Sequence, residues 1–286
     1  MSNSAGSYWL EVLGPFQVRR GATVLDLGSM KQQAVLAQLV LRAGRPVSYD
    51  ELEAAVWGPN APVTARQIMH TYVARLRRQL EPEKPPRGRV GVIGPAPFGY
   101  RLVLDPGRID MVRFRRLAGD ARSQYADGHP NQALATLGEA MRLWRDPALT
   151  ELSRLLRHSH EVESLRESWT EAALAYVTLG VELNADAAVR PAAEWLARLN
   201  PLDERIQAHY LTILARDGHR VAALHRFAEI RARLDEELGV RPGPELAAVH
   251  RRLVDWAWTG IGDEVFPTRP ADWWRRPAPP PGKRAH

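Results

Sequence analysis

The chain of 286 residues contains no cysteine. This absence excludes a disulfide framework, a cysteine-based zinc site and a thiol nucleophile. The sequence also lacks an apolar run of the roughly 18 residues that a membrane-spanning helix needs. Residues 1–6 are small and polar, without the basic and apolar regions of a secretory signal. We therefore expect a cytoplasmic protein that makes no membrane contact.

Acidic residues are outnumbered in the first third of the chain. Residues 1–108 hold 14 Lys and Arg against 8 Asp and Glu, whereas residues 109–261 hold 20 against 22. Residues 262–286 hold 5 against 3. A basic segment joined to a near-neutral body is typical of a polyanion-binding module. The alternative is a modest excess of surface charge that has no role.

Short β-rich runs separated by turn residues occupy both ends of the first third. Residues 8–27 predict a small antiparallel meander of three strands, with turns at Gly14-Pro15 and Arg20-Gly21. Residues 87–104 alternate in the manner of a strand and predict a β-hairpin, whose turn we place at residues 94–99.

Apolar residues at helical spacing predict three helices between these strands, over residues 31–43, 48–57 and 64–80. The second and third helices each open with the pattern of a capping box, which pairs Ser48 with Glu51 and Thr64 with Gln67. The order of meander, three helices and hairpin predicts an α+β winged helix-turn-helix with an additional N-terminal sheet.

The chain beyond residue 108 reads as helix. The predicted spans are residues 110–127, 130–144, 158–184, 187–199, 203–217, 220–238 and 244–258. The tripeptide Asp-Gly-His at residues 127–129 recurs at residues 217–219, each time between two predicted helices. Such turns join the helix pairs of tetratricopeptide-like repeats, because glycine accepts the positive φ that the turn needs. The alternative is chance similarity between two helix hairpins.

The last segment, residues 262–286, is proline-rich and aperiodic, which predicts a basic, disordered tail. Trp273 and Trp274 stand out within it. They could anchor on a partner or fold back on the body, and our prediction is a solvated end.

The third predicted helix is the informative element, because no Asp or Glu occurs from residue 61 to residue 80. Its apolar stripe comprises Ala65, Met69, Tyr72, Val73, Leu76 and Leu80. The opposite side carries Arg66, Gln67, His70, Thr71, Arg75 and Arg78, with Arg77 on the flank. Ion pairs within the helix cannot explain these arginines. The major groove of DNA admits such a helix, and there Arg pairs with guanine and Gln with adenine.

Individual side chains of this helix differ in what the pattern implies. Arg75 and Arg78 are our first candidates for direct base contacts. Arg77 fits a phosphate contact or no role, and His70 needs no role at the surface. For each arginine the alternative is an ordinary solvated charge. Within the hairpin, Arg89 and Arg101 lie near the strand ends and could reach phosphates.

The tip of the hairpin, Pro95-Ala96-Pro97-Phe98, has no basic residue. This composition argues against insertion of the tip into the minor groove.

Two sets of segments carry a family resemblance. "LGPFQVRRG", "MKQQAVLAQLVLRAGRPVSYDELEAAVWG", "TARQIMHTYVARLRRQL" and "GYRLVL" resemble the OmpR/PhoB-type winged helix of the Streptomyces antibiotic regulatory protein family. "FRRLAGDARSQYADGHPNQALATLGEAMRLWRD" and "HRVAALHRFAEIRARLDEELGVRPGPELAAVHRRLV" resemble the bacterial transcriptional activation domain that follows it. The resemblance implies a DNA-binding domain over residues 1–108 and tetratricopeptide-like helices over residues 109–261, with only the tail outside it.

The resemblance further implies an activator of clustered antibiotic-biosynthesis genes. Such proteins bind double-stranded promoter DNA at direct repeats near the −35 region as side-by-side protomers, and they recruit RNA polymerase holoenzyme with its sigma factor. We therefore expect a nucleoid-associated protein that needs no cofactor. The loop that would face the polymerase comprises Gly58, Pro59, Asn60, Ala61 and Pro62.

Other functions are less well supported by the residues. The sequence has no G-x-x-x-x-G-K-[ST] motif and no receiver domain before the winged helix, so we expect a small stand-alone member of the family that is not an enzyme. The pair His158 and His160 is a poor metal chelate, because side chains two residues apart on a helix diverge. The remaining alternative is a helical-repeat adaptor that binds proteins without specific DNA binding.

Overall fold

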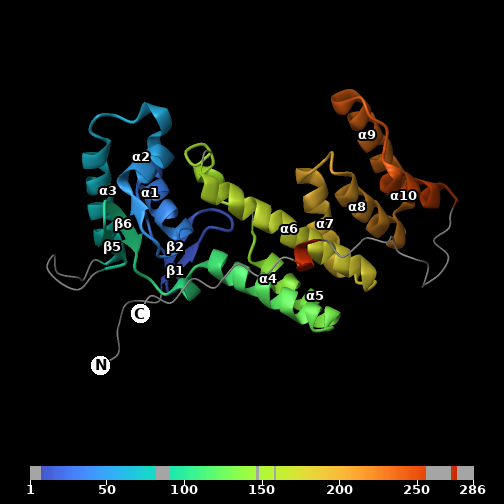
Figure 1. Cartoon of the computed structure of the whole chain (residues 1–286), viewed down its shortest axis with the longest axis horizontal. Helices are drawn as coiled ribbons and strands as arrows, with labels where there is room; N and C mark the ends of the chain where they lie inside the picture. The colour runs from blue at the N-terminus through green and yellow to red at the C-terminus, as the bar shows by residue number, and fades with distance from the viewer. Residues whose placement is uncertain (1–7, 82–90, 146–147, 158, 256–271, 276–286) are drawn as a thin grey trace. The chain divides into compact units, whose positions relative to one another are not determined.

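The computed structural model describes residues 8–81, 91–145, 148–157, 159–255 and 272–275 (Figure 1). The chain divides into two compact units. One unit comprises residues 1–116 and 142–167, and the other comprises residues 117–141 and 168–286.

The first unit contains two three-stranded antiparallel sheets. One has the order β1 (Tyr8–Glu11), β2 (Gln17–Arg20), β3 (Thr23–Val24); the other has the order β4 (Val47–Ser48), β6 (Gly99–Leu102), β5 (Ile93–Ala96). Between the sheets in sequence lie α1 (Met30–Leu41), α2 (Tyr49–Trp57), the 3-10 turn η1 (Gly58–Asn60) and α3 (Ala65–Leu80). The predicted winged helix-turn-helix is confirmed. The strand β4 has only two residues, too few for the sequence pattern to reveal.

The starts of α2 and α3 differ. At α2, Glu51 N donates to Ser48 Oγ at 3.2 Å and Ser48 N donates to the Glu51 carboxylate at 2.8 Å, so the predicted capping box is present. The capping box predicted at Thr64 is wrong, because its side chain makes no capping hydrogen bond. Its ψ of 8° departs from the extended conformation that an N-cap side chain needs.

We call the hairpin of β5 and β6 the wing. Its turn comprises fewer residues than predicted. Strand β5 continues to Ala96 and pairs Pro95 with Tyr100, so the turn consists of Pro97 and Phe98 rather than residues 94–99. β5 is an edge strand, since it pairs only with β6. Proline lacks an N–H, and an edge strand tolerates this because its outer side forms no ladder.

Seven helices follow the wing in the described residues. They are α4 (Asp110–Ala126), α5 (Pro130–Arg142), α6 (His160–Glu182), α7 (Asp186–Leu199), α8 (Glu204–Arg216), α9 (Arg220–Leu238) and α10 (Pro244–Asp255), with 3-10 turns η2 (Pro106–Arg108), η3 (Thr150–Leu152) and η4 (Asp272–Arg275). Their limits agree with the predicted ones to within two residues, apart from the predicted end of the last helix, which lies outside the described residues.

The two Asp-Gly-His turns have the same geometry. Gly128 and Gly218 both have φ of 80°. The N–H of the next residue, His129 or His219, donates to the carbonyl five residues earlier at 2.8 Å in each case. This is the hydrogen bond of a helix C-terminus that ends in a left-handed glycine, and it confirms the repeated helix-hairpin turn.

The end of the chain contains a buried turn. Trp273 and Trp274 in η4 are only 4% and 9% exposed. The prediction of a solvated, disordered end is therefore wrong for these two residues. An aperiodic sequence gives no sign of such burial, because the surface that covers the indoles belongs to a helix far away in the chain.

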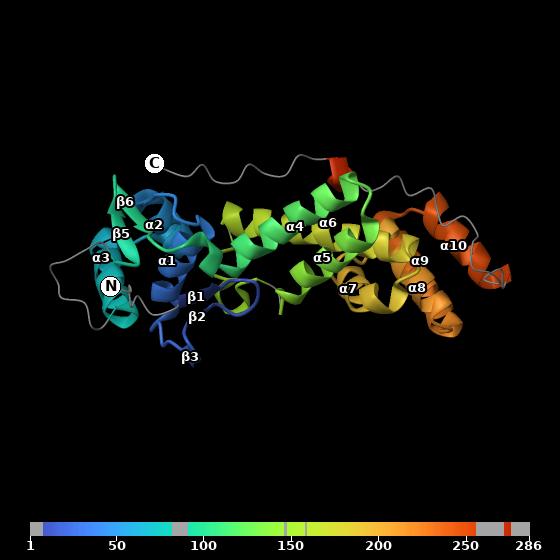
Figure 2. The same ribbon diagram turned by 90° about the horizontal axis from the view of Figure 1, so that it is seen from below.

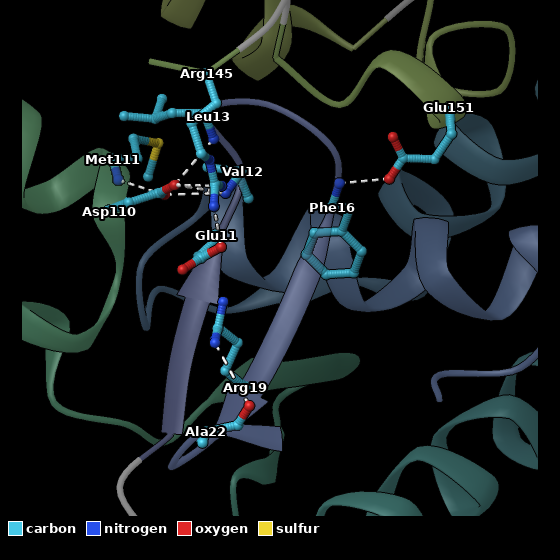
Figure 3. Close-up of polar contacts among 10 residues, drawn as sticks. All are labelled: Glu11, Val12, Leu13, Phe16, Arg19, Ala22, Asp110, Met111, Arg145 and Glu151. Atoms are coloured by element: carbon cyan, nitrogen blue, oxygen red, sulfur yellow. Dashed lines mark hydrogen bonds and ion pairs between the residues drawn. The ribbon is translucent and has the colours of Figure 1, made fainter. Parts of the chain in front are cut away.

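Carboxylates hold the loop between β1 and β2. The Asp110 carboxylate accepts hydrogen bonds from Val12 N and Leu13 N at 3.0 Å and from Met111 N at 2.7 Å (Figure 3). Glu151 accepts another from Phe16 N at the far end of the same loop. These acceptors satisfy backbone N–H groups of the loop and so fix the end of the sheet to the segments that follow the wing.

Asp110 titrates at an unusual pH because of this position. Its side chain is only 12% exposed. Burial raises the pKa of Asp110 to about 6, although the three backbone N–H groups and the guanidinium of Arg145 lower it. A folded-state pKa above the unfolded value of 3.8 means that the folded protein binds this proton more tightly.

The stabilising contribution of Asp110 should therefore be complete below pH 3.8 and decline as the pH rises through 6. We expect the free energy of unfolding of the wild type, relative to that of Asp110→Asn, to fall by about 2–2.5 kcal/mol between pH 4 and pH 7. Urea denaturation of both proteins across this pH range measures the difference between their free energies of unfolding. The contributions of the other titrating groups are shared by the two proteins and cancel in this difference. A difference that is constant with pH would contradict the assignment.

Candidate nucleic-acid interface

The buried stripe of α3 sets which side chains face solvent. Its members Ala65, Met69, Val73, Leu76 and Leu80 are each at most 2% exposed. This confirms the predicted stripe except at Tyr72, which is half-buried and stacks on Trp57 with ring centroids 6.3 Å apart. Burial of five apolar side chains fixes the rotation of the helix about its axis.

The side of α3 opposite this stripe carries two arginines that have no partner among the described residues. Arg75 and Arg78 are exposed, and neither makes a hydrogen bond or ion pair with any other residue that the structure describes. They are three residues apart and therefore neighbours on one face. Within the described part of the chain, their charge is not neutralised, so this face is suited to an anion.

Arg66 has partners that the sequence did not reveal. Its guanidinium lies 3.1 Å from an Asp50 oxygen and 3.7 Å from a Glu53 oxygen, both on α2, and 5.1 Å from the ring centroid of Tyr49. The sequence of α3 alone indicates only ion pairs within that helix, and these two partners lie on another helix. The signal that was missed is the acidic first turn of α2. The Arg66 side chain is 56% exposed, so these pairs are weak and can yield to a phosphate.

Arg77 joins α3 to the wing. Its Nε donates to the carbonyl of Ile93 in β5 at 3.0 Å, and its guanidinium lies 5.5 Å from the ring centroid of Tyr100 in β6. The side chain is half-buried. A phosphate contact by Arg77 stays a prediction, and the structure adds a role in positioning the wing.

His70 makes a second connection to the same strand. Its Nδ1 lies 2.5 Å from the hydroxyl of Tyr100, and its ring packs edge-to-face on Tyr49 at 5.3 Å. The other polar residues on this side, Gln67 and Thr71, are exposed, and the Thr71 hydroxyl donates to the Gln67 carbonyl at 3.1 Å. Gln67 is thus exposed on the same side of α3 as Arg75 and Arg78.

The wing presents a basic strand and an apolar tip. Arg101 in β6 is exposed, whereas Arg89 lies outside the described residues. Phe98 at the tip is 84% exposed with φ of 55°. Its carbonyl accepts a hydrogen bond from Tyr49 N at 2.7 Å, which fixes the tip to the start of α2.

The loop between α2 and α3 is open to solvent. Gly58 is half-buried and Pro59, Asn60, Ala61 and Pro62 are exposed. Val63, the last residue of the loop, is fully exposed. The loop thus ends in an apolar side chain that no residue in the described ranges covers.

No group of three or more His, Asp or Glu side chains among the described residues could hold a metal ion. His160 is exposed at the start of α6, and His158 lies outside the described residues. Every helix in the described ranges is too short or too polar to cross a lipid bilayer.

Two family models match the chain. The model for the bacterial transcriptional activator domain matches residues 109–254, and the model for the C-terminal domain of transcriptional regulatory proteins matches residues 25–102. Transcriptional regulatory protein MoaR1 of Mycobacterium tuberculosis is 30% identical over 88% of this chain and 81% of its own length. Regulatory protein DnrI of Streptomyces peucetius is 28% identical over 86% and 91%.

Two longer proteins are also similar. Regulatory protein AfsR of Streptomyces griseus is 32% identical over 94% of this chain but only 26% of its own length. The structure of Mycobacterium tuberculosis EmbR, solved with a low-affinity phosphopeptide, matches with a TM-score of 0.69 at 28% identity. The match covers 88% of this chain and 66% of the EmbR chain. These relatives are named as regulatory proteins and not as enzymes.

Replacement of Arg77 and replacement of Arg75 should affect the stability of the protein differently. We expect Arg77→Ala to lower the free energy of unfolding by about 1–2 kcal/mol, because it removes a hydrogen bond to the wing and a cation–π contact. Arg75→Ala is the matched control and should change it by less than about 0.5 kcal/mol. Urea titration followed by circular dichroism measures both. Equal stability of the two variants would contradict the positioning role of Arg77.

Proposed function

This chain belongs to the Streptomyces antibiotic regulatory protein family, and we propose that it activates genes of a secondary-metabolite cluster by binding direct repeats near the −35 region. Two protomers bind side by side, and they recruit RNA polymerase holoenzyme with its sigma factor. Residues 1–108 serve as the DNA-binding domain and residues 109–261 as the activation domain. The chain is thus a DNA-binding transcriptional regulator rather than an enzyme.

The observation that carries this proposal is the pair Arg75 and Arg78 on α3. Both guanidinium groups are exposed and unpaired within the described residues, on a helix whose opposite face is buried. A guanidinium fork matches the O6 and N7 acceptors of guanine in the major groove. Gln67 lies about two to three turns earlier on the same side of the helix, and its amide can donate one hydrogen bond to adenine and accept another.

The surrounding groups supply phosphate contacts that are independent of base sequence. Arg66 can exchange its partners on α2 for a phosphate, and Arg101 presents a charge from the wing. Thr71 and His70 complete the polar side of the helix. Contacts of this kind fix register on the duplex but carry no sequence information.

The adaptor hypothesis predicts a different response to DNA and to salt. A helical-repeat protein that binds only proteins has no use for unpaired arginines on α3, and it would show no DNA binding that falls steeply with salt. Salt-dependent preference for one promoter sequence therefore separates the two functions.

We expect Arg75→Ala and Arg78→Ala each to weaken binding to the promoter repeats by about 1–3 kcal/mol and to relax the preference for one base pair in each repeat. Arg66→Ala should instead weaken specific and random DNA alike and lower the salt slope by about one. Fluorescence anisotropy with labelled promoter and random duplexes, at three salt concentrations, measures these effects.

Ser123→Ala, an exposed change on α4, serves as the control and should bind as the wild type does. If Arg75→Ala and Arg78→Ala retain wild-type affinity and preference, α3 does not read bases through this face.

Transcription should depend on the loop before α3 without a change in DNA affinity. We expect replacement of Asn60-Ala61-Pro62-Val63 by Gly-Ser-Gly-Ser to lower activated transcription at least tenfold, because the exposed loop is the proposed polymerase contact. Promoter affinity should stay within twofold. In vitro transcription with purified holoenzyme, beside anisotropy, measures both quantities. Parallel loss of affinity and activity would remove the loop from the polymerase interface.

A further inference from the structure

The buried turn η4 has a specific receptor surface on the second unit. Figure 2 shows η4 against the C-terminal half of α4. Trp274 stacks on Tyr125 of α4, with ring centroids 4.1 Å apart and 24° between the planes. The guanidinium of Arg122 lies 4.0 Å from the ring centroid of Trp273, and the two indoles pack edge-to-face at 4.7 Å.

The chemistry of this contact selects its ligand. Arg122 and Tyr125 are one helical turn apart, so they present a cation and a phenol ring side by side. Each meets a separate indole: the cation faces one π-system, and the phenol ring stacks on the other. Opposite Arg122, a leucine would offer no π-system and a lysine would repel the guanidinium. The surface therefore recognises two consecutive aromatic rings rather than apolar side chains in general.

The length of chain before η4 allows more than one way to fill this surface. The turn is separated from α10, which ends at Asp255, by residues 256–271. Sixteen residues span at most on the order of 55 Å when fully extended. That reach is comparable with the size of a small domain, so the same segment can meet either its own α4 or that of an adjacent copy. Residues 272–275 also lie outside both family matches, which cover residues 25–102 and 109–254.

We propose that the Arg122–Tyr125 surface of α4 is a receptor for a Trp-Trp segment, closed in cis by Trp273 and Trp274 and able to take the same segment of a second copy. The choice of a second copy rests on the proposed side-by-side binding to direct repeats. Exchange of the segment would then link neighbouring protomers through their activation domains. In the free protein the tethered segment outcompetes any partner, because its effective concentration reaches the millimolar range.

The receptor is tested by emptying it in the full-length protein. We expect Trp273→Ala/Trp274→Ala to bind a fluorescein-labelled peptide of residues 270–277 saturably and at least tenfold more tightly than the wild type does. Adding Arg122→Gln and Tyr125→Leu should abolish this binding, whereas adding the neighbouring Ser123→Ala should not. Absence of peptide binding, or equal binding by wild type and the emptied variant, overturns the receptor.

The second-copy occupant is tested by complementation between two full-length variants. Trp273→Ala/Trp274→Ala retains the receptor without the ligand, and Arg122→Gln/Tyr125→Leu retains the ligand without the receptor. We expect each to sediment as a monomer alone and an equimolar mixture to form a heterodimer. Peptide binding without this heterodimer overturns exchange between copies and leaves a latch that closes only in cis.

Both measurements are made without DNA and are accompanied by circular dichroism melts. Failure here with intact promoter binding would overturn the receptor alone. Intact complementation with no promoter binding would overturn the proposed DNA-binding function alone.

Discussion

Burial of one face of α3 is the constraint on which the proposed DNA interface depends. Five apolar side chains, from Ala65 to Leu80, lose nearly all contact with water. Rotation of the helix by a quarter turn would expose part of this stripe and bury arginine. Because burying an unpaired guanidinium is far more costly than exposing it, Arg75 and Arg78 must face outward. The geometry of the interface thus follows from packing on its opposite side.

One set of polar contacts holds α3 against the wing, and a second set holds the β1–β2 loop. Arg77 and His70 both meet strands of the wing, through Ile93 and Tyr100, so the wing cannot shift without breaking them. The β1–β2 loop is held in turn by Asp110 and Glu151 (Figure 3). Asp110 is the first residue of α4, so the carboxylate that gathers the loop amides also fixes the start of the helical segment to the sheet of its own unit.

The sequence was sufficient for most structure that follows from local periodicity or local chemistry, although the capping box predicted at Thr64 and the predicted limits of the wing turn were wrong. The α3 stripe, the capping box at Ser48 and the turns at Gly128 and Gly218 depend on residues within about one helical turn of each other. The pairing of Arg66 with α2, by contrast, depends on how two helices pack. The burial of Trp273 depends on a receptor about 150 positions earlier in the chain. No local pattern encodes such contacts.

The most direct test of the central claim is a methylation-interference experiment on the promoter repeats. If α3 reads the major groove through Arg75 and Arg78, methylation of guanine N7 at one or two positions in each repeat should block binding of the wild-type protein. The interference should lie on the same face of the duplex in both repeats. Binding that is indifferent to guanine N7 methylation, or that is blocked only by methylation of adenine N3 in the minor groove, would contradict the account.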